Sequence, residues 1–368
     1  MKRIFSLLLA FAVAAAPFVT FADDADTAKN YAISLETAIQ MAYDGNEQLE
    51  ANEIEQYGNQ MSIKSAERSQ WDIRKMPVNV SSNFEMYCMK NGYYIEAAQM
   101  ALRISQSENE QIKSSIAYNV TEAYYNLVLM QKLVNAAQNS YDLALDNKKV
   151  VDAQYNLGMI PHLDYQNADL TVEKCKNALN AYKLNAEIAE QNLKILINKD
   201  GENCTVTPTD EIECESYSSD VSKDTENALK TRHDIKALKE QMDLAEKYFD
   251  MASVLTENSA TYNTAYASFK KAEYNYTHVS KLQSLAIKQS YNTILTSSAD
   301  MDTARLTYEM KLREYESAKL KYELGMITNL DLTSSINDLY SAQVSYANAK
   351  LTYRLAVEKY KYEITVGL

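Results

Sequence analysis

The sequence predicts a mostly α-helical protein made of two tandem repeats, each a pair of very long antiparallel helices. Three observations support this prediction. The 368 residues include only 7 Gly and 4 Pro, so the chain has few places to turn. Apolar residues recur at steps of three and four over long stretches, as in amphipathic helices. Finally, the segment from Tyr155 to Asp164 returns from Tyr322 to Asp331, 167 positions later, which indicates a duplication.

Each copy of this segment places a glycine behind one helical pattern and opens another helix a few residues later. Glycine is the preferred residue just beyond a helix C-terminus, because it adopts the left-handed conformation without strain. Both copies read Leu-Gly-Met-Ile and predict tight turns between antiparallel helices. The predicted turn residues are Gly158, Met159, Ile160, Gly325, Met326 and Ile327.

The N-terminal segment, residues 1–22, predicts a secretory signal peptide. Met1-Lys2-Arg3 precedes an apolar run from Ile4 to Val19, and small residues follow at positions 20 and 22. The run is shorter than the roughly 20 residues of a spanning helix, which disfavours the alternative of an uncleaved anchor. We therefore expect an exported protein.

The rest of the chain divides into two repeats and a linker. Residues 23–198 form the first predicted repeat and residues 223–368 the second. The linker, residues 199–222, is richer in Ser, Thr and turn-forming residues than the helical patterns on either side.

The segment 76–96 differs from its surroundings. Apolar residues alternate with polar ones from Val78 to Cys88, and Asn91-Gly92 follows. Period-2 alternation before Asn-Gly predicts a β-hairpin. Its first strand is long enough to cross a bilayer at a tilt, although a surface hairpin fits equally. The second repeat is shorter than the first between matching positions, by about the length of one hairpin, so we expect that it has lost this hairpin.

Cys204 and Cys214 bracket a short loop in the linker. In an exported protein this pair forms either a disulfide or two free thiols, and the sequence leaves both open.

The sequence contains no catalytic constellation. It has no Gly-rich phosphate loop, and its three histidines lack neighbours at metal-ligand spacing. We therefore expect no enzyme, no cofactor and no metal site. The net charge of −13 with dispersed acids disfavours nucleic acid as a partner.

Over the whole mature chain, these features together resemble the TolC-like outer-membrane efflux protein family. Besides the two turn motifs, four segments carry the resemblance: Leu35-Glu-Thr-Ala-Ile39, Asn46-Glu-Gln-Leu49, Ala228-Leu-Lys-Thr-Arg-His-Asp-Ile235 and Tyr360-Lys-Tyr-Glu-Ile-Thr-Val-Gly367. The order and spacing of these motifs are more specific than any one of them.

The resemblance implies a homotrimer whose twelve long helices form a hollow periplasmic cylinder, continued by strands in the outer membrane. The two turns would form the periplasmic tip, where the family meets a periplasmic adaptor (membrane fusion) protein of an inner-membrane pump. Gly158 and Gly325 match the family's tip glycines. Asp164 and Asp331 match its acidic tip positions, where a ring of carboxylates favours cations, although simple N-capping of the outgoing helices explains both residues as well. Ile327 and Ser334 stand where some members place charged gate residues, so no salt-bridged gate is implied.

Two function classes follow. The first is a passive, trimeric efflux duct of a tripartite pump. The second is a cell-envelope scaffold that keeps the helical part, because one hairpin per chain supplies only six strands, too few to enclose a solute pore. An exported enzyme is a third class, and no clustered catalytic residues favour it.

Overall fold

The computed structural model describes residues 29–367. The predicted signal peptide, residues 1–22, lies outside this part of the chain. The described elements are β1 (Lys29–Ile33), α1 (Leu35–Tyr43), α2 (Glu47–Ile73), α3 (Phe84–Lys90), α4 (Tyr93–Asn156), α5 (His162–Leu196), β2 (Cys204–Pro208), α6 (Val221–Thr231), α7 (His233–Ala252), α8 (Ala260–Glu323) and α9 (Asn329–Glu363).

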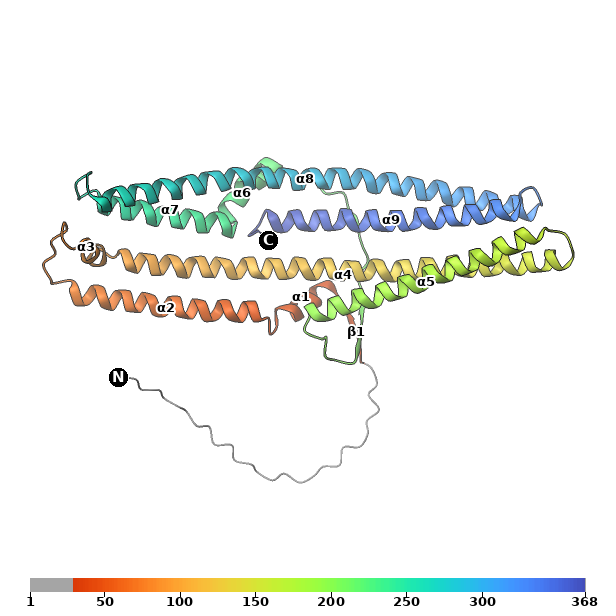
Figure 1. The fold of residues 1–368 in the computed structure, drawn as a ribbon, viewed down its shortest axis with the longest axis horizontal. Helices are drawn as coiled ribbons and strands as arrows, with labels where there is room; N and C mark the ends of the chain where they lie inside the picture. Colours follow the sequence, from red (N-terminus) through yellow and green to blue (C-terminus); the bar gives the residue numbers. More distant parts are fainter. Residues whose placement is uncertain (1–28, 368) are drawn as a thin grey trace, which may run out of the picture.

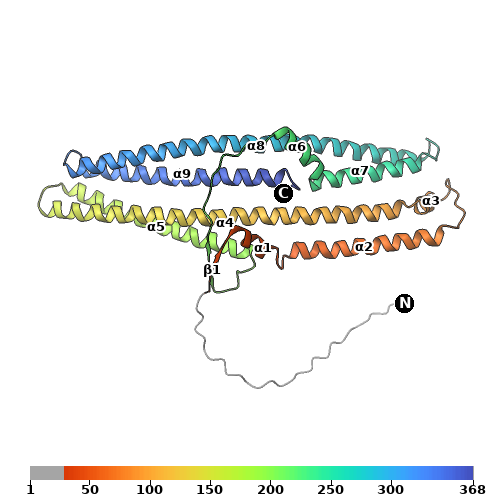
Figure 2. The same ribbon diagram turned by 180° about the vertical axis from the view of Figure 1, so that it is seen from behind.

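The helices form four parallel rows, shown in Figure 1 and from behind in Figure 2. Two rows are the single helices α4 and α8, each 64 residues and thus about 96 Å long at 1.5 Å per residue. The other two rows each consist of two shorter helices placed end to end, α2 with α5 and α7 with α9. The α2/α5 row packs on α4, α4 packs on the α7/α9 row, and α8 packs on that same row. The predicted tandem helical hairpins are confirmed.

The two repeats match in their helices and differ at one end. α5 and α9 are 35 residues each, as α4 and α8 are 64 each. α2 has 27 residues against 20 in α7, and the next connection spans residues 74–92 instead of 253–259. The turns after α4 and α8 therefore lie together at one end, and the unequal connections lie together at the other (Figure 1).

The β-hairpin predicted for 76–96 is wrong. Residues 84–90 form α3, and α4 already begins at Tyr93. The Asn83 side chain accepts a hydrogen bond from the Met86 amide and so caps α3. Gly92, with φ +80°, connects α3 to α4 instead of turning a hairpin. The extra length of the first repeat is thus helix and a helical connection. In the second repeat, residues 251–270 are the end of α7, a turn and the start of α8.

The core is concentrated at mid-length, in a belt that we call the collar: β1, α1, β2, α6 and the linker. β1 and β2 pair in parallel, from Lys29 opposite Cys204 to Ile33 opposite Pro208. One buried cluster joins these strands and α1 to the middle of α4, and a second joins α6 to α8 and α9 around Tyr360. Among residues 29–367, none of the helices combines the length and apolarity that a membrane span requires.

The cysteines of the described chain are free thiols. Cys204 is buried in β2, and the Cys214 thiol lies 3.6 Å from the backbone oxygen of Lys350 on α9. Each residue is held by a different part of the collar, so the disulfide considered between them is not formed in this structure.

Candidate functional site: the paired turns and the row edges

The turns after α4 and α8 have the same backbone geometry. Gly158 and Gly325 both adopt φ +71°. The amides of Gly158 and Met159 donate to the carbonyls of Tyr155 and Gln154, at 2.8 and 2.9 Å. The same two bonds recur in the second turn, to the carbonyls of Tyr322 and Lys321. This paired arrangement is the Schellman motif, which satisfies the last carbonyls of a helix and requires a left-handed residue.

Alanine at Gly158 or Gly325 is expected to lower the free energy of unfolding by about 1–2 kcal/mol, the usual strain of a left-handed L-residue. No heavy atom lies within 4 Å of the added Cβ, so backbone strain alone sets the effect. Gly58, inside α2 and equally open, is the matched control, where alanine should stabilise by about 0.5–1 kcal/mol. Denaturant unfolding measures all three variants, and destabilisation at Gly58 equal to that at Gly158 would contradict this account.

The turns expose apolar side chains in repeat-related pairs. They are 59–74% exposed, which is unusual for such large apolar groups: Leu157, Met159, Leu163, Leu324, Met326 and Leu330. Ile160 and Ile327 are half-buried. Because six apolar side chains gather where both repeats end, the tip is suited to contact another protein.

Asp331 caps α9. Its carboxylate accepts hydrogen bonds from the backbone amide of Thr328 at 2.9 Å and from the Thr328 hydroxyl at 2.7 Å. The Asp331 amide donates to the Thr328 hydroxyl oxygen in return, which completes a capping box. The capping role considered for this residue is therefore present. A gating role for Asp331 stays a prediction.

Asp164 lies at the corresponding point of α5, but Pro161 precedes this helix and supplies no capping side chain. The Asp164 amide donates to the Pro161 carbonyl at 3.1 Å. With Asn329 and Thr333 of α9, Asp164 lines a cavity of about 20 Å³ between the two outgoing helices. Close by, the Asn147 amide on α4 donates to the Thr333 hydroxyl at 3.2 Å. The two repeats thus meet through polar side chains just behind the tip.

The cap on α9 should weaken in acid. Hydrogen bonds from Thr328 hold the pKa of the Asp331 carboxyl below its ordinary value of 3.8. A lowered folded-state pKa contributes stability that is complete above 3.8 and is lost as the pH falls through the lowered value. Hydrogen exchange at the first amides of α9 should therefore speed up there beyond its intrinsic pH dependence. Thr328→Ala should abolish this extra change, and the first turn of α5, which lacks a capping box, serves as the internal control.

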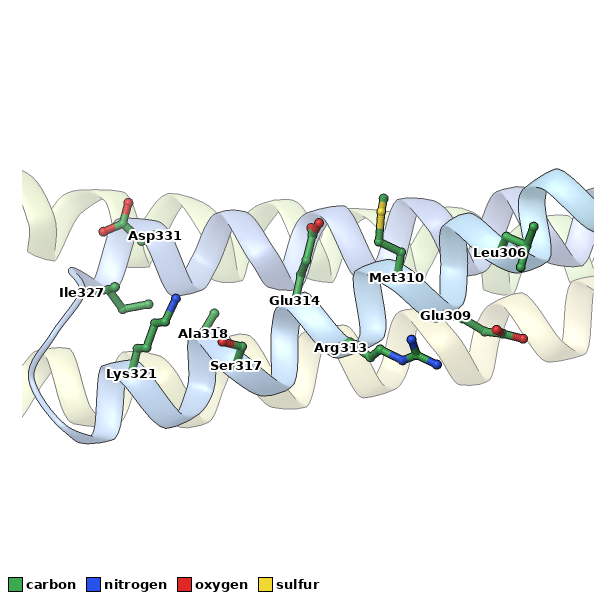
Figure 3. Close-up of a pocket in the computed structure, with 10 residues that line it drawn as sticks. All are labelled: Leu306, Glu309, Met310, Arg313, Glu314, Ser317, Ala318, Lys321, Ile327 and Asp331. Atoms are coloured by element: carbon green, nitrogen blue, oxygen red, sulfur yellow. The ribbon is translucent and has the colours of Figure 1, made fainter.

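A groove of about 680 Å³ runs along α8 and α9 from the turn (Figure 3). Ile327 and Asp331 line its tip end, and Leu306 its far end. Arg313 and Lys321 alternate with Glu309 and Glu314 between them. Because both charge signs and apolar groups share an open surface, the groove fits a protein helix better than a small molecule.

The two outer rows carry apolar stripes that no part of the described chain covers. At about 100° per residue, the exposed apolar residues of α5 fall on one face, and those of α8 do the same. On α5 they are Leu163, Leu170, Leu184, Ile188 and Ile195. On α8 they are Tyr266, Tyr274, Leu285, Leu295, Leu306, Met310 and Leu320. The layer of four rows therefore ends in two different apolar edges, which the sequence alone does not predict.

The described residues offer no obvious chemistry for catalysis. Within 29–367, no three His, Cys, Asp or Glu side chains gather in a metal-binding arrangement. The perturbed groups are largely tyrosines, whose pKa values burial raises, as at Tyr118 and Tyr322. Such residues fit packing roles.

The fold is that of known outer membrane channels. The CmeC outer membrane channel of Campylobacter jejuni aligns with a TM-score of 0.69 at 15% identity, over 96% of this chain and 93% of that one. The outer membrane protein VceC of Vibrio cholerae aligns with a TM-score of 0.71 at 13% identity, over 90% and 96%. At such low identity these likenesses establish the fold alone.

The family model described as outer membrane efflux protein matches residues 73–199. This chain belongs to that family. The matched part of this outer membrane efflux protein runs from the last residue of α2 to just past α5 and includes the first turn. The predicted family and the outer-membrane class of the protein are thereby confirmed, and the relatives are channels and an export protein, not enzymes.

A curated relative is the "Toxin and drug export protein A" of Aggregatibacter actinomycetemcomitans. It is 22% identical to this efflux protein over 276 residues, which are 73% of this chain and 56% of the relative. The chain thus spans little more than half the length of that relative.

Proposed function

We propose that this efflux protein forms a trimeric, passive export duct that works with a periplasmic adaptor and an inner-membrane pump. The observation that carries the proposal is the pair of unlike apolar edges on one layer of helices. The family and the solved channels of the same fold support it. The cargo class, small molecules or peptides, comes from the family resemblance and from the printed name of the relative.

Two unlike edges favour a closed ring. The α5 edge of one copy faces the α8 edge of the next, which is a head-to-tail contact. Head-to-tail contacts leave an apolar edge open at each end unless the copies close into a ring. Three copies of four rows make the twelve-row cylinder implied by the family resemblance.

The residue heights on the two edges agree with this pairing. α5 runs away from the tip and α8 runs toward it, with both turns at the same end (Figure 2). The distance along the helix from the start of α5 at His162 to Ile188 nearly equals the distance from Leu295 to the end of α8 at Glu323. At 1.5 Å per residue the two positions differ in height by about 3 Å. Leucine and isoleucine at near-heptad steps on α5 suit a helix-to-helix seam.

The apolar tip provides the adaptor contact in this proposal. Six exposed leucines and methionines border the turns, and the mixed groove on α8 and α9 begins directly beside them. A helical hairpin of an adaptor can pair with such a tip because its own end is of the same size and shape.

A cysteine pair tests the ring. Ile188→Cys/Leu295→Cys should form a covalent ladder that stops at three chains under mild oxidation. Each single variant is the control, since the native thiols are buried or half-buried. A double variant that stays monomeric on oxidation, with native helix content, would contradict the ring.

The tip is tested in the same background. Met159→Gln/Met326→Gln should leave the covalent trimer intact and abolish export of a dye or drug in cells that lack other channels. Full export by this variant would contradict adaptor docking at the tip. Trimers that never affect export in any strain would instead favour the envelope scaffold.

A further inference from the structure

The end opposite the turns is closed by a fixed helical cap, residues 74–92, including α3. The Gln70 side chain donates to the Lys90 carbonyl, and the Lys90 ammonium group donates to the Met76 carbonyl, both at 3.0 Å. Phe84 packs edge-on against Tyr248 of α7 with ring centres 5.5 Å apart. Cys88 is fully buried, and burial raises the pKa of its thiol to about 11. The cap is therefore a packed element with defined side-chain positions.

This end presents large apolar side chains to solvent. Trp71, the only tryptophan of the chain, is 63% exposed at the last turn of α2. Met76 in the cap is 47% exposed, and Val254 in the neighbouring α7–α8 turn is 56% exposed. Both views place the cap and this turn side by side (Figures 1 and 2). These side chains form an apolar surface at one end of a rod about 100 Å long.

The charge of the cap differs from that of the chain. It carries Arg74, Lys75 and Lys90 against the single acid Glu85, whereas the whole chain has a net charge of −13. The Arg74 guanidinium carbon lies 3.1 Å from the centre of the Trp71 ring. Exposed cations beside a tryptophan match a surface that offers phosphates above hydrocarbon, since tryptophan prefers the boundary between headgroups and acyl chains.

The ring contact does not cover this surface. Neighbouring copies meet along the α5 and α8 edges, at the sides of the rods, whereas Met76 and Val254 belong to the connections at the rod's end. A partner for this surface must approach along the rod axis.

We propose that the end formed by the cap and by residues 253–259 docks on the surface of a phospholipid bilayer. Trp71, Met76 and Val254 enter the headgroup region, and Arg74 and Lys75 bind lipid phosphates. The inference rests on the proposed outer-membrane duct and deepens it, because it names the side chains through which this end meets the membrane.

The single tryptophan makes the test local. The full-length chain is mixed with vesicles of phosphatidylethanolamine and phosphatidylglycerol, and its tryptophan emission is recorded. The expected result is a blue shift, together with quenching by lipids brominated near the top of their acyl chains. Met76→Gln/Val254→Gln should weaken vesicle binding by about ten-fold or more. Arg74→Gln and Lys75→Gln should each weaken it about five-fold, because each cation near an anionic surface contributes about 1 kcal/mol.

Met159→Gln/Met326→Gln, which removes two equally exposed apolar side chains at the other end, is the matched control and should bind vesicles like the parent. Emission of Trp71 that stays unchanged while the protein sediments with vesicles would overturn the proposal, since contact would then run through another segment, such as residues 1–22. A chain that binds no vesicles at all would overturn it too. Covalent trimers with unchanged emission would refute the membrane contact alone, and shifted emission without trimers would refute the ring alone.

Discussion

Arg232→Met is expected to lower the free energy of unfolding by about 3 kcal/mol, because it leaves a partly buried carboxylate and a backbone carbonyl without their partner. Arg232 is only 6% exposed. Its Nε and Nη2 donate to the two oxygens of Asp234 at 3.0 and 3.1 Å, and its Nη1 donates to the Glu363 carbonyl at 2.8 Å. Methionine replaces the packing of the side chain but none of these bonds.

The loss should be transmitted to the closure of the second repeat. Arg232 joins the start of α7 to the end of α9, and the neighbouring His233 amide donates to the Val366 carbonyl at 3.0 Å. Asp234 also accepts from Gln283 on α8 at 2.9 Å. Hydrogen exchange should therefore increase at the last turn of α9 as well as in α7.

The control is Lys230→Met, in the last turn of α6. Lys230 and Glu226 form an exposed ion pair along α6, and exposed pairs of this kind contribute less than about 0.5 kcal/mol. Denaturant unfolding compares the two variants. Equal losses at positions 230 and 232 would show that the junction contributes nothing special.

Tyr124→Phe is expected to cost about 2–4 kcal/mol, although it removes a single oxygen, because several buried polar groups lose their partner. Tyr124 is fully buried on α4. Its hydroxyl accepts from the backbone amides of Thr209 and Asp210, both at 3.1 Å, and lies within donating distance of the Ile33 carbonyl at 2.9 Å and of the Asp210 carboxylate at 3.0 Å. Phenylalanine leaves up to two amides and an acceptor unpaired in a buried place, at about 1–3 kcal/mol each before relaxation.

The matched control is Tyr291→Phe, at the equivalent position of α8 in the second repeat. The Tyr291 ring packs against Tyr360 with centres 5.5 Å apart, so its packing should survive the change. The loss should therefore stay under about 1 kcal/mol, as for a single hydrogen bond at most. Thermal unfolding followed by circular dichroism compares the two. A near-neutral Tyr124→Phe would mean that water or the Asp210 carboxylate replaces the hydroxyl.

The long helices and both turns were predictable because their signals are local. Gly158 and Gly325 each follow a long apolar pattern, and the left-handed residue that ends a helix is chosen by the backbone of its own turn. The repeat then doubled the information, since one period placed two turns at once. Family motifs added the expected assembly.

The error at 76–96 has an equally local cause. Val78, Val80, Phe84, Met86 and Cys88 satisfy a period of two, but Phe84 and Cys88 are also one helical turn apart. The caps decide between the two patterns: Asn79 accepts from the amides of Ser81 and Ser82, and Asn83 then starts α3. Packing of Phe84 against Tyr248, which belongs to the other repeat, favours the helix in a way that no local window contains.

The collar and the row edges were missed for the same reason. Arg232 owes its role to the carbonyl of Glu363 at the far end of the second repeat, and β1 finds its partner strand only after the whole first repeat has passed. The edges are recognisable only once it is known which helices lie on the outside, because α5 and α8 have apolar positions on inner and outer faces alike.

The equal lengths of α4 and α8 act as a ruler for any engineered or evolved variant. Deleting one residue from α4 alone would lower its turn by about 1.5 Å and rotate it by about 100° against its twin. The apolar rim would then be tilted and half of it turned away from a docking partner. Changes of length should therefore be tolerated only in both hairpins together and in whole heptad steps, whereas the far end, where residues 74–92 face 253–259, already shows that unequal lengths are accepted there.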